Sequence, residues 1–334
     1  MQQLSHGDVT AAAERVLGRV RPVTVAPLDP GAVRSEAPGG PDPEVWLALE
    51  YLQHTGSFKA RGAVNFLYAH RAAGTLPDTG VTIASGGNAG LACAWAARTL
   101  GVTATVFLPA GAPPVKIAKL EEYGASVRLV DGEYADAADA CERFAEQSGA
   151  LRSHAYDHPL VAAGAGTLLE ELRALIPGLD TVVVAVGGGG LFAGVATAAQ
   201  RHGLRTIAVE PENSRALNAA LLAGRPVDVS VDSIAADALG ARRASPMALR
   251  AAQDPGSRSV LVPDRAIAAA RRALWDRSRI VTELSGATAL ACLPLAGTDG
   301  AGYTPAPGER IAVVLCGANT DPSDLVAPAP GRPA

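Results

Sequence analysis

The chain has 334 residues, of which 48% are hydrophobic and 19% charged, and its net charge is −4. This length allows one large domain or two ordinary ones, and the mild acidity argues against binding to nucleic acid or an anionic membrane, because no basic field would attract either. Only three of the 29 basic residues are lysines, Lys59, Lys116 and Lys119, so few amines are available for chemistry.

The N-terminal segment lacks the apolar core of a signal peptide, so we expect a soluble, cytoplasmic protein. One uncharged stretch, 181–200, has the length of a membrane-spanning helix, but four glycines interrupt it and its first half is β-branched. We therefore interpret it as a buried strand, a glycine turn and a helix. The cysteines form no CxxC pair, so we expect neither a zinc site nor a disulfide framework; they are Cys93, Cys141, Cys292 and Cys316.

Short β-rich segments alternate along the chain with alanine-rich helical segments. In the first half this alternation predicts strands at 81–85, 104–108 and 127–130, and helices at 88–100, 113–123 and 134–147. In the second half it predicts strands at 181–186, 205–210 and 310–315, and helices at 160–175, 191–202, 264–277 and 284–295. Such alternation is typical of α/β proteins with mostly parallel sheets that helices cover on both faces.

The pattern predicts two three-layer α/β domains. One is a compact unit at 80–150, and the other is a larger unit at 155–325. The tail, rich in proline and alanine from Pro322 onward, is expected to be frayed, with 326–334 outside both domains. Ligands of paired α/β units usually bind in the crevice at the carboxyl ends of the strands.

The segment TVVVAVGGGGLFAG at 181–194 joins a buried strand to a helix through four glycines. Converging backbone N–H groups and the helix dipole make such a turn an anion site, which suits a phosphate. Gly188, Gly190 and Ala193 also fit a dinucleotide fingerprint, with Glu210 after the next strand, so an NAD-dependent oxidoreductase is an alternative. A tight crossover without a ligand is a third, although each glycine forfeits up to about 1 kcal/mol of helix stability against alanine.

The segment TGSFKARGA at 55–63 places Lys59 just inside a helix start, where it could be a surface lysine or an amine held in a desolvated pocket. Three further motifs follow in order: SGGNAG at 85–90, GGGGL at 187–191 and CGAN at 316–319. Jointly they resemble the fold-type-II pyridoxal-phosphate enzymes, which have a tryptophan synthase β-like fold. The resemblance implies a large cofactor-binding domain at 1–70 together with 155–325, and a small domain at 71–154 that closes over the substrate. Within these, the chain is similar to the serine/threonine dehydratase family, and most to its L-serine dehydratase branch. The resemblance extends from about residue 15 to about 320 and outweighs the NAD interpretation.

The resemblance implies a site for pyridoxal 5′-phosphate built from all four motifs. Lys59 would be the catalytic residue and would bind the cofactor as a Schiff base. The other implied cofactor-binding residues are Phe58, Asn88, Gly187, Gly188, Gly189, Gly190, Leu191, Glu283 and Cys316. The substrate carboxylate would bind at the start of a helix, to Ser85, Gly86, Gly87, Asn88 and Ala89.

The implied reaction is the β-elimination of L-serine, L-threonine or a related β-hydroxy amino acid to a 2-oxo acid and ammonia, in a homodimer. The freed amine of Lys59 would take the Cα proton. The thiol of Cys316, a weak acid, would leave the pyridine nitrogen unprotonated, which suits elimination. β-Replacement, threonine synthase-like chemistry and a non-catalytic relative stay open, because residue types alone do not exclude them.

Several positions depart from the family pattern. Gly86 stands where racemases of the family carry a second serine, so racemisation is disfavoured. Glu210 keeps one acid of a divalent metal site, but the second position is Ala216. Glu210 and the backbone carbonyl of Ser214 could hold a monovalent cation such as K⁺, or Glu210 could be a solvated carboxylate. Ala238 replaces a glycine beside the cofactor, so substrate choice could be unusual. The six histidines are expected at the surface or at a hinge.

Overall fold

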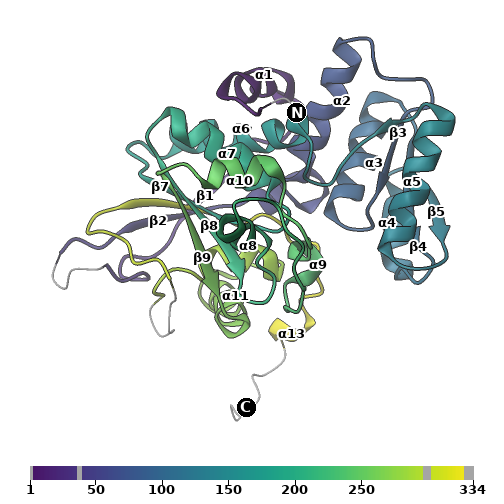
Figure 1. Cartoon of the computed structure of the whole chain (residues 1–334). Coiled ribbons are helices and arrows are strands. Elements are labelled where there is room, and N and C mark those ends of the chain that lie inside the picture. Colours follow the sequence, from purple (N-terminus) through teal and green to yellow (C-terminus); the bar gives the residue numbers. More distant parts are fainter. Residues whose placement is uncertain (1–2, 36–39, 296–301, 327–334) are drawn as a thin grey trace.

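The computed structural model describes residues 3–35, 40–295 and 302–326, which form two β-sheets flanked by helices (Figure 1). The strands are β1 (Val25–Pro27), β2 (Glu44–Ala48), β3 (Val81–Ala84), β4 (Ala104–Pro109), β5 (Ser126–Val130), β6 (Leu151–Arg152), β7 (Thr181–Ala185), β8 (Arg205–Pro211), β9 (Ser257–Val262) and β10 (Arg310–Val314).

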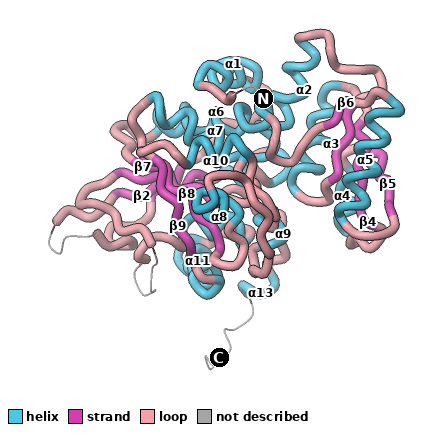
Figure 2. The backbone as a smooth tube through the Cα atoms, in the orientation of Figure 1, coloured by secondary structure: helices cyan, strands magenta, loops and turns pink. Residues whose placement is uncertain are grey.

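The α-helices follow the strands along most of the chain, as Figure 2 shows. They are α1 (His6–Val16), α2 (Lys59–Ala72), α3 (Asn88–Leu100), α4 (Pro114–Glu122), α5 (Tyr134–Ser148), α6 (Pro159–Leu175), α7 (Gly190–Arg201), α8 (Ala216–Ala223), α9 (Ala236–Leu239), α10 (Pro246–Ala252), α11 (Asp264–Ser278), α12 (Leu284–Leu290) and α13 (Ser323–Val326). Two short 3-10 helices, η1 (Glu50–Leu52) and η2 (His54–Gly56), precede α2.

The smaller sheet has the strand order β5-β4-β3-β6, and all its neighbouring strands are parallel. In β4, Val106 and Leu108 belong to a core that includes residues of α3. Phe107 lies between them in sequence and packs instead with Ala137 and Cys141 of α5. Because successive side chains of a strand point to opposite faces, α3 and α5 cover opposite faces of this sheet and give it three layers.

The larger sheet has the order β1-β2-β10-β7-β8-β9, with β1 antiparallel to β2 and the other neighbours parallel. Val182 and Val184 of β7 pack in one core with α6 and α7. Val183 faces a second core, formed with α11 and α12. The predicted α/β architecture, with mostly parallel sheets between helical layers, is confirmed. The division into domains at 71 and 155 stays a prediction.

Helix α2 joins the two sheets, because it packs on α6 beside the larger sheet and on α3 beside the smaller one (Figure 1). Two glycines let α2 and α6 approach closely. A Cβ atom on Gly62 would lie 2.7 Å from the carbonyl oxygen of Val161, and one on Gly164 would lie 2.5 Å from that of Arg61. The residue that begins α2, Lys59, is therefore held against the larger sheet's helical layer.

Most predicted elements are present, with ends shifted by at most one residue. The helix predicted at 284–295 is the exception, because α12 ends at Leu290. The elements that the sequence analysis missed are α1, β1, β2, η1, η2, β6, α8, α9, α10, β9 and α13, most of them short. Short elements carry few periods of the apolar pattern, so tertiary contacts decide them.

Two further predictions concern the C-terminal tail and the uncharged stretch at 181–200. The tail from Pro322 is not frayed throughout, because Ser323–Val326 form α13 and Leu325 is buried; residues 327–334 lie outside the described part. The uncharged stretch 181–200 forms β7, the glycine turn and α7. Among the helices of the described ranges, none combines the length and the apolar character needed to cross a bilayer.

Candidate functional site

Lys59 begins α2, directly after a tight turn in which Thr55 and Gly56 have left-handed backbone, with φ of 63° and 73°. Its Nζ atom donates a hydrogen bond of 2.6 Å to the carbonyl oxygen of Ala155. Burial lowers the pKa of Lys59 to about 8, although nearby Cys316 and Glu283 oppose this shift. Lys59 is therefore no ordinary surface lysine: its neutral amine is accessible close to physiological pH.

The glycine turn after β7 is closed by neighbours that leave no room for side chains. A Cβ atom on Gly188 would lie 2.3 Å from the ring of Tyr156, and one on Gly189 would lie 2.3 Å from the Cβ of Ala248. Gly189 also has a φ of +93° and caps the N-terminus of α7. Lys59, Gly190, Leu191 and Tyr156 line one small cavity, so the turn and the lysine share a site.

A chain of polar contacts joins Asn88, at the start of α3, to the end of β10. The side-chain nitrogen of Asn88 donates to both carboxylate oxygens of Glu283, at 2.9 and 3.1 Å. The backbone N–H and the side-chain amide of Asn319 bond Glu283 and Asn88 respectively, at 2.8 and 2.7 Å. Ser285 donates to Glu283 at 2.8 Å and lies 3.8 Å from the sulfur of Cys316. The structure thus brings three predicted residues, Asn88, Glu283 and Cys316, together.

Cys316 is buried and lies two residues after the end of β10. It is next to residues 55–58, the turn before Lys59, which we call the lysine turn. Its carbonyl oxygen accepts a hydrogen bond from the backbone N–H of Phe58 at 3.0 Å. Burial, reinforced by the negative charge of Glu283, raises the pKa of its thiol to about 12. The thiol is therefore protonated at neutral pH and can act only as a weak hydrogen-bond donor.

The predicted substrate segment, 85–89, connects β3 to α3. Gly87 caps α3 through its backbone alone, so the first N–H groups of this helix are open to an anion. Gly90 keeps the turn tight, because a Cβ atom there would lie 1.9 Å from the carbonyl oxygen of Ser85. The geometry suits a carboxylate at this end of the helix.

Glu210, the candidate cation ligand, is buried rather than solvated, as is Ser214. Its two carboxylate oxygens accept backbone N–H bonds from Leu217 and Asn218, at 2.7 and 2.8 Å. It therefore caps α8, and burial raises its pKa to about 8 despite these bonds. The hydroxyl of Ser214 donates to the carbonyl oxygen of Leu239 at 2.9 Å. Whether a cation binds here stays a prediction.

Two residues that the sequence analysis did not place in the site shape its wall. Tyr156 lies against the glycine turn and donates its hydroxyl hydrogen to the carbonyl oxygen of Arg243 at 3.2 Å. His154 accepts backbone N–H bonds from Tyr156 and Asp157 at 3.2 and 2.8 Å, and burial lowers its pKa to about 4. His154, which the sequence analysis expected at the surface or at a hinge, is half-buried and shapes the turn that presents the carbonyl oxygen of Ala155 to Lys59.

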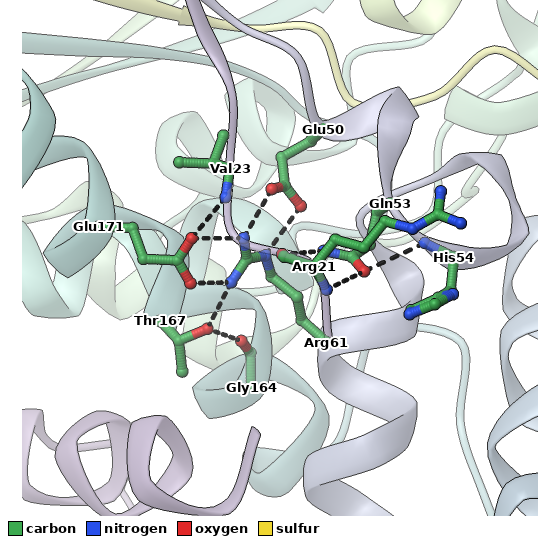
Figure 3. A network of polar contacts seen from close by, with 9 residues as sticks. All are labelled: Arg21, Val23, Glu50, Gln53, His54, Arg61, Gly164, Thr167 and Glu171. Carbon is green, nitrogen blue, oxygen red and sulfur yellow. Dashed lines mark hydrogen bonds and ion pairs between the residues drawn. The ribbon is translucent and has the colours of Figure 1, made fainter. Parts of the chain in front are cut away.

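A buried ion-pair network is centred on Arg61, two residues after Lys59 (Figure 3). Arg61, fully buried, bonds Glu50 through two nitrogens at 2.7 and 2.8 Å. It also bonds Glu171 of α6 at 2.6 and 3.0 Å and Thr167 at 3.2 Å. Because Arg61 lies two residues after Lys59, the network fixes the first turn of α2. The motif TGSFKARGA displayed Arg61, but nothing local indicated its partners.

A larger cavity, of about 410 Å³, lies on the other side of the lysine turn. Thr55 and Gly56 line it together with Trp95 and Tyr123, whereas Lys59 does not. His54 stacks on Trp95 in its wall, with ring centroids 4.4 Å apart. Lys59 therefore faces the smaller cavity at the glycine turn.

The residues fit pyridoxal phosphate. The glycine turn at the start of α7 presents backbone N–H groups to an anion, and the Lys59 amine lines the same cavity. The hydroxyl of Ser57, two residues before Lys59, is buried without a hydrogen-bond partner among the described residues, which leaves a donor for a bound group. A phosphate suits the glycine turn, and an aldehyde suits the amine of Lys59.

Comparison with known proteins agrees with this geometry. Residues 25–317 match a family model described as "Pyridoxal-phosphate dependent enzyme". An L-threonine ammonia-lyase from Geobacter sulfurreducens is 36% identical over 75% of this chain, which spans only 62% of that relative's length. A serine dehydratase-like protein from Mus musculus is 34% identical over 92% of this chain and 94% of its own. The structure of maize serine racemase superposes with a TM-score of 0.85 at 26% identity, over 97% of this chain and 96% of that one.

The fold and the site thus define a fold-type-II enzyme, and the chain belongs to the family of pyridoxal-phosphate dependent enzymes. Within that family, its relatives support pyridoxal-phosphate-dependent β-elimination by an ammonia-lyase. The resemblance found in the sequence is confirmed. This assignment decides against the NAD-dependent interpretation of the glycine turn.

Proposed function

We propose that the chain removes water and then ammonia from L-serine, L-threonine or a related β-hydroxy amino acid, and so forms a 2-oxo acid. One observation carries this proposal: the amine of Lys59, whose pKa burial lowers to about 8, lines the same small cavity as the glycine turn. When bound, pyridoxal 5′-phosphate supplies the electron sink that stabilises negative charge at Cα.

The residues of the site divide the remaining work. The backbone N–H groups of Gly187, Gly188, Gly189, Gly190 and Leu191 would hold the phosphate. Lys59, once its amine is free, would take the Cα proton. A large fraction of this amine is neutral when the pH is near its pKa of about 8. Cys316 would face the pyridine nitrogen as a neutral thiol. Because a thiol is a weak acid, it would leave this nitrogen unprotonated, which favours elimination of the β-hydroxyl.

The amino acid would bind across the crevice between the two sheets. Its carboxylate would meet the N-terminus of α3, at Ser85, Gly86, Gly87, Asn88 and Ala89. Glu283 and Asn319 support this by orienting the side chain of Asn88 toward the larger sheet. Phe58 would pack beside the cofactor ring, because its own ring lies 4.9 Å from the Nζ atom of Lys59.

Racemisation is not part of the proposal. It would need a second acid or base on the face of Cα opposite Lys59, and Gly86 offers none. A side chain at position 86 would also collide with Leu108, whose Cδ2 atom would lie 2.8 Å from the new Cβ. The likeness to a racemase structure therefore concerns the fold, while this position favours elimination.

The proposal includes a K⁺ ion near Glu210 and the backbone carbonyl of Ser214. Glu210 is buried, and a cation beside it would favour the ionised carboxylate against the burial that raises its pKa to about 8. Activity that is equal in K⁺ and in the larger tetramethylammonium ion would remove the cation from the proposal. We further propose a cytoplasmic homodimer.

The test is incubation of the holoenzyme with L-serine, L-threonine, D-serine and O-acetyl-L-serine, followed by assays for 2-oxo acid and ammonia. We expect equal amounts of both products from L-serine or L-threonine, none from D-serine, and no activity in Lys59→Ala. Turnover of O-acetyl-L-serine with a thiol, without 2-oxo acid from any substrate, would indicate β-replacement instead. Formation of D-serine would contradict the role given to Gly86.

A further inference from the structure

Three side chains that can bind a metal meet where α1, α6 and α7 pack together. His6 begins α1, Glu170 lies on α6, and His202 follows the last residue of α7. The Nε2 atoms of His6 and His202 lie 3.3 and 3.0 Å from the same oxygen of Glu170, Oε1. All three ligand atoms lie within 4.8 Å of one another, although 164 and 32 residues separate the bonded pairs.

These separations are close to what a tetrahedral zinc ion requires. Zinc binds histidine nitrogen and carboxylate oxygen at about 2.0–2.2 Å, so two ligands at a tetrahedral angle lie roughly 3.3 Å apart. The two nitrogen–oxygen distances already match. The two histidine rings meet edge to face with centroids 5.6 Å apart, and their side chains are 34% and 21% exposed, so small rotations can bring the nitrogens closer.

Nε2 of His202 has two neighbours that make opposite demands on it. Nη1 of Arg173 lies 2.9 Å away and Oε1 of Glu170 lies 3.0 Å away. One imidazole nitrogen can accept from the guanidinium or donate to the carboxylate, but it cannot do both. A metal ion would take the lone pair of His202 in place of Arg173, whose side chain is 37% exposed and can turn outward.

The two oxygens of Glu170 have different partners. Oε2 accepts a hydrogen bond from Arg173 at 2.9 Å, whereas Oε1 faces the two histidine nitrogens. Histidine Nε2 and carboxylate oxygen together form a ligand set that zinc accepts, with one position left for water.

We propose that His6, Glu170 and His202 form a zinc site that fastens α1 to α6 and α7. Helix α1 buries small side chains, Val9, Ala12 and Val16, so an ion at its first residue would add to its attachment. The proposed role is structural: Glu170 is next to Glu171, which bonds Arg61 of α2, but the carboxylate of Glu170 itself contacts His6 and His202.

The test is a calorimetric titration of the holoenzyme, without a histidine tag, with Zn²⁺. We expect one equivalent to bind, and His6→Asn and His202→Asn each to weaken binding by at least about 10- to 100-fold, the loss that even an outer partner of a metal ligand causes. His54→Asn is the matched control, since His54 stacks on Trp95 away from the cluster, and it should bind like the wild type.

Arg173→Ala separates a metal site from a plain ion-pair network. If zinc binds, removal of the nearby positive charge should tighten binding; in a plain network, the loss of Arg173 creates no affinity for metal. Zn²⁺ should also raise the Tm of the wild type but not that of His6→Asn, because binding to the folded state alone stabilises it. The proposal is wrong if neither the wild type nor Arg173→Ala shows saturable binding, or if both histidine variants bind as the wild type does.

Discussion

At the scale of single residues, Lys59 is set apart from the other two lysines by its surroundings. Burial lowers its pKa to about 8, well below the ordinary value of 10.5. Arginine could not replace it, because a guanidinium keeps its proton throughout the accessible pH range. The amine must be neutral to react with an aldehyde, so its reactivity should follow its own titration.

We expect the rate at which the apoprotein binds pyridoxal phosphate to rise with pH up to about 8 and then level off. Because the folded-state pKa is depressed, the neutral amine gains population as pH rises through 8, whereas an ordinary lysine would gain until about 10.5. Stopped-flow absorbance of the cofactor measures the rate, with Lys116→Ala as the control that should leave the profile unchanged. A rate still climbing steeply above pH 9.5 would show that Lys59 is not desolvated.

Gly188 is the second residue whose role is decided by its contacts. We expect Gly188→Ala to lower the affinity for pyridoxal phosphate by at least about tenfold, because its Cβ would lie 2.3 Å from the ring of Tyr156 and displace the turn. Equilibrium dialysis of the cofactor measures the change. Gly111→Ala, where a Cβ meets nothing within 4 Å, is the control. Tyr156→Ala combined with Gly188→Ala should recover part of the affinity; no recovery would place the conflict elsewhere.

At the scale of elements, α4 of the smaller sheet carries both remaining lysines toward the larger sheet. The Nζ atom of Lys116 bonds Asp237 of α9 at 2.6 Å, and that of Lys119 bonds Asn319 at 3.2 Å. Helix α9 in turn packs on the glycine turn, since a Cβ on Gly187 would lie 3.1 Å from Leu239. The helix that seemed ordinary in sequence thus bridges the two halves of the site.

We expect Lys116→Ala to raise KM for the amino acid by up to about fivefold with little change in kcat. The pair is partly exposed, at 36% and 73%, and such pairs contribute at most about 1 kcal/mol. Steady-state kinetics at low and high salt measure the effect, which salt should diminish. Asp237→Asn should match Lys116→Ala, and the double variant should be no worse than either; full additivity would mean that the contact does not act as a pair.

At the scale of the whole molecule, the network around Arg61 ties the lysine turn to α6. Glu50 and Glu171 reach Arg61 from opposite sides, and Glu171 also accepts the backbone N–H of Val23 at 2.7 Å (Figure 3). Arg61 and Glu50 are 0% and 1% exposed, so neither charge can turn to water if its partner is lost. This network is therefore a point on which stability depends.

We expect Glu50→Gln to lower the free energy of unfolding by about 1–3 kcal/mol, because the buried Arg61 loses one of its two carboxylate partners and keeps the other, Glu171. Urea unfolding of the holoenzyme measures it. Glu44→Gln is the control, because Glu44 pairs with Arg310 at 3.5 Å on the surface, 50% exposed, and should change stability by no more than about 0.5 kcal/mol. Equal losses in both variants would show that burial does not govern the pair.

The sequence by itself determined the alternation of strands and helices and four motifs of the site, because apolar periodicity and glycine turns are local properties. Helix α3 has the predicted bounds, and Lys59 begins α2 as expected. Tertiary structure alone decided which distant groups meet: Asn319 with Asn88 across 231 residues, and Glu210 with the N-terminus of α8 instead of water. A side chain's partner depends on how the layers pack, and neither spacing nor residue type encodes that packing.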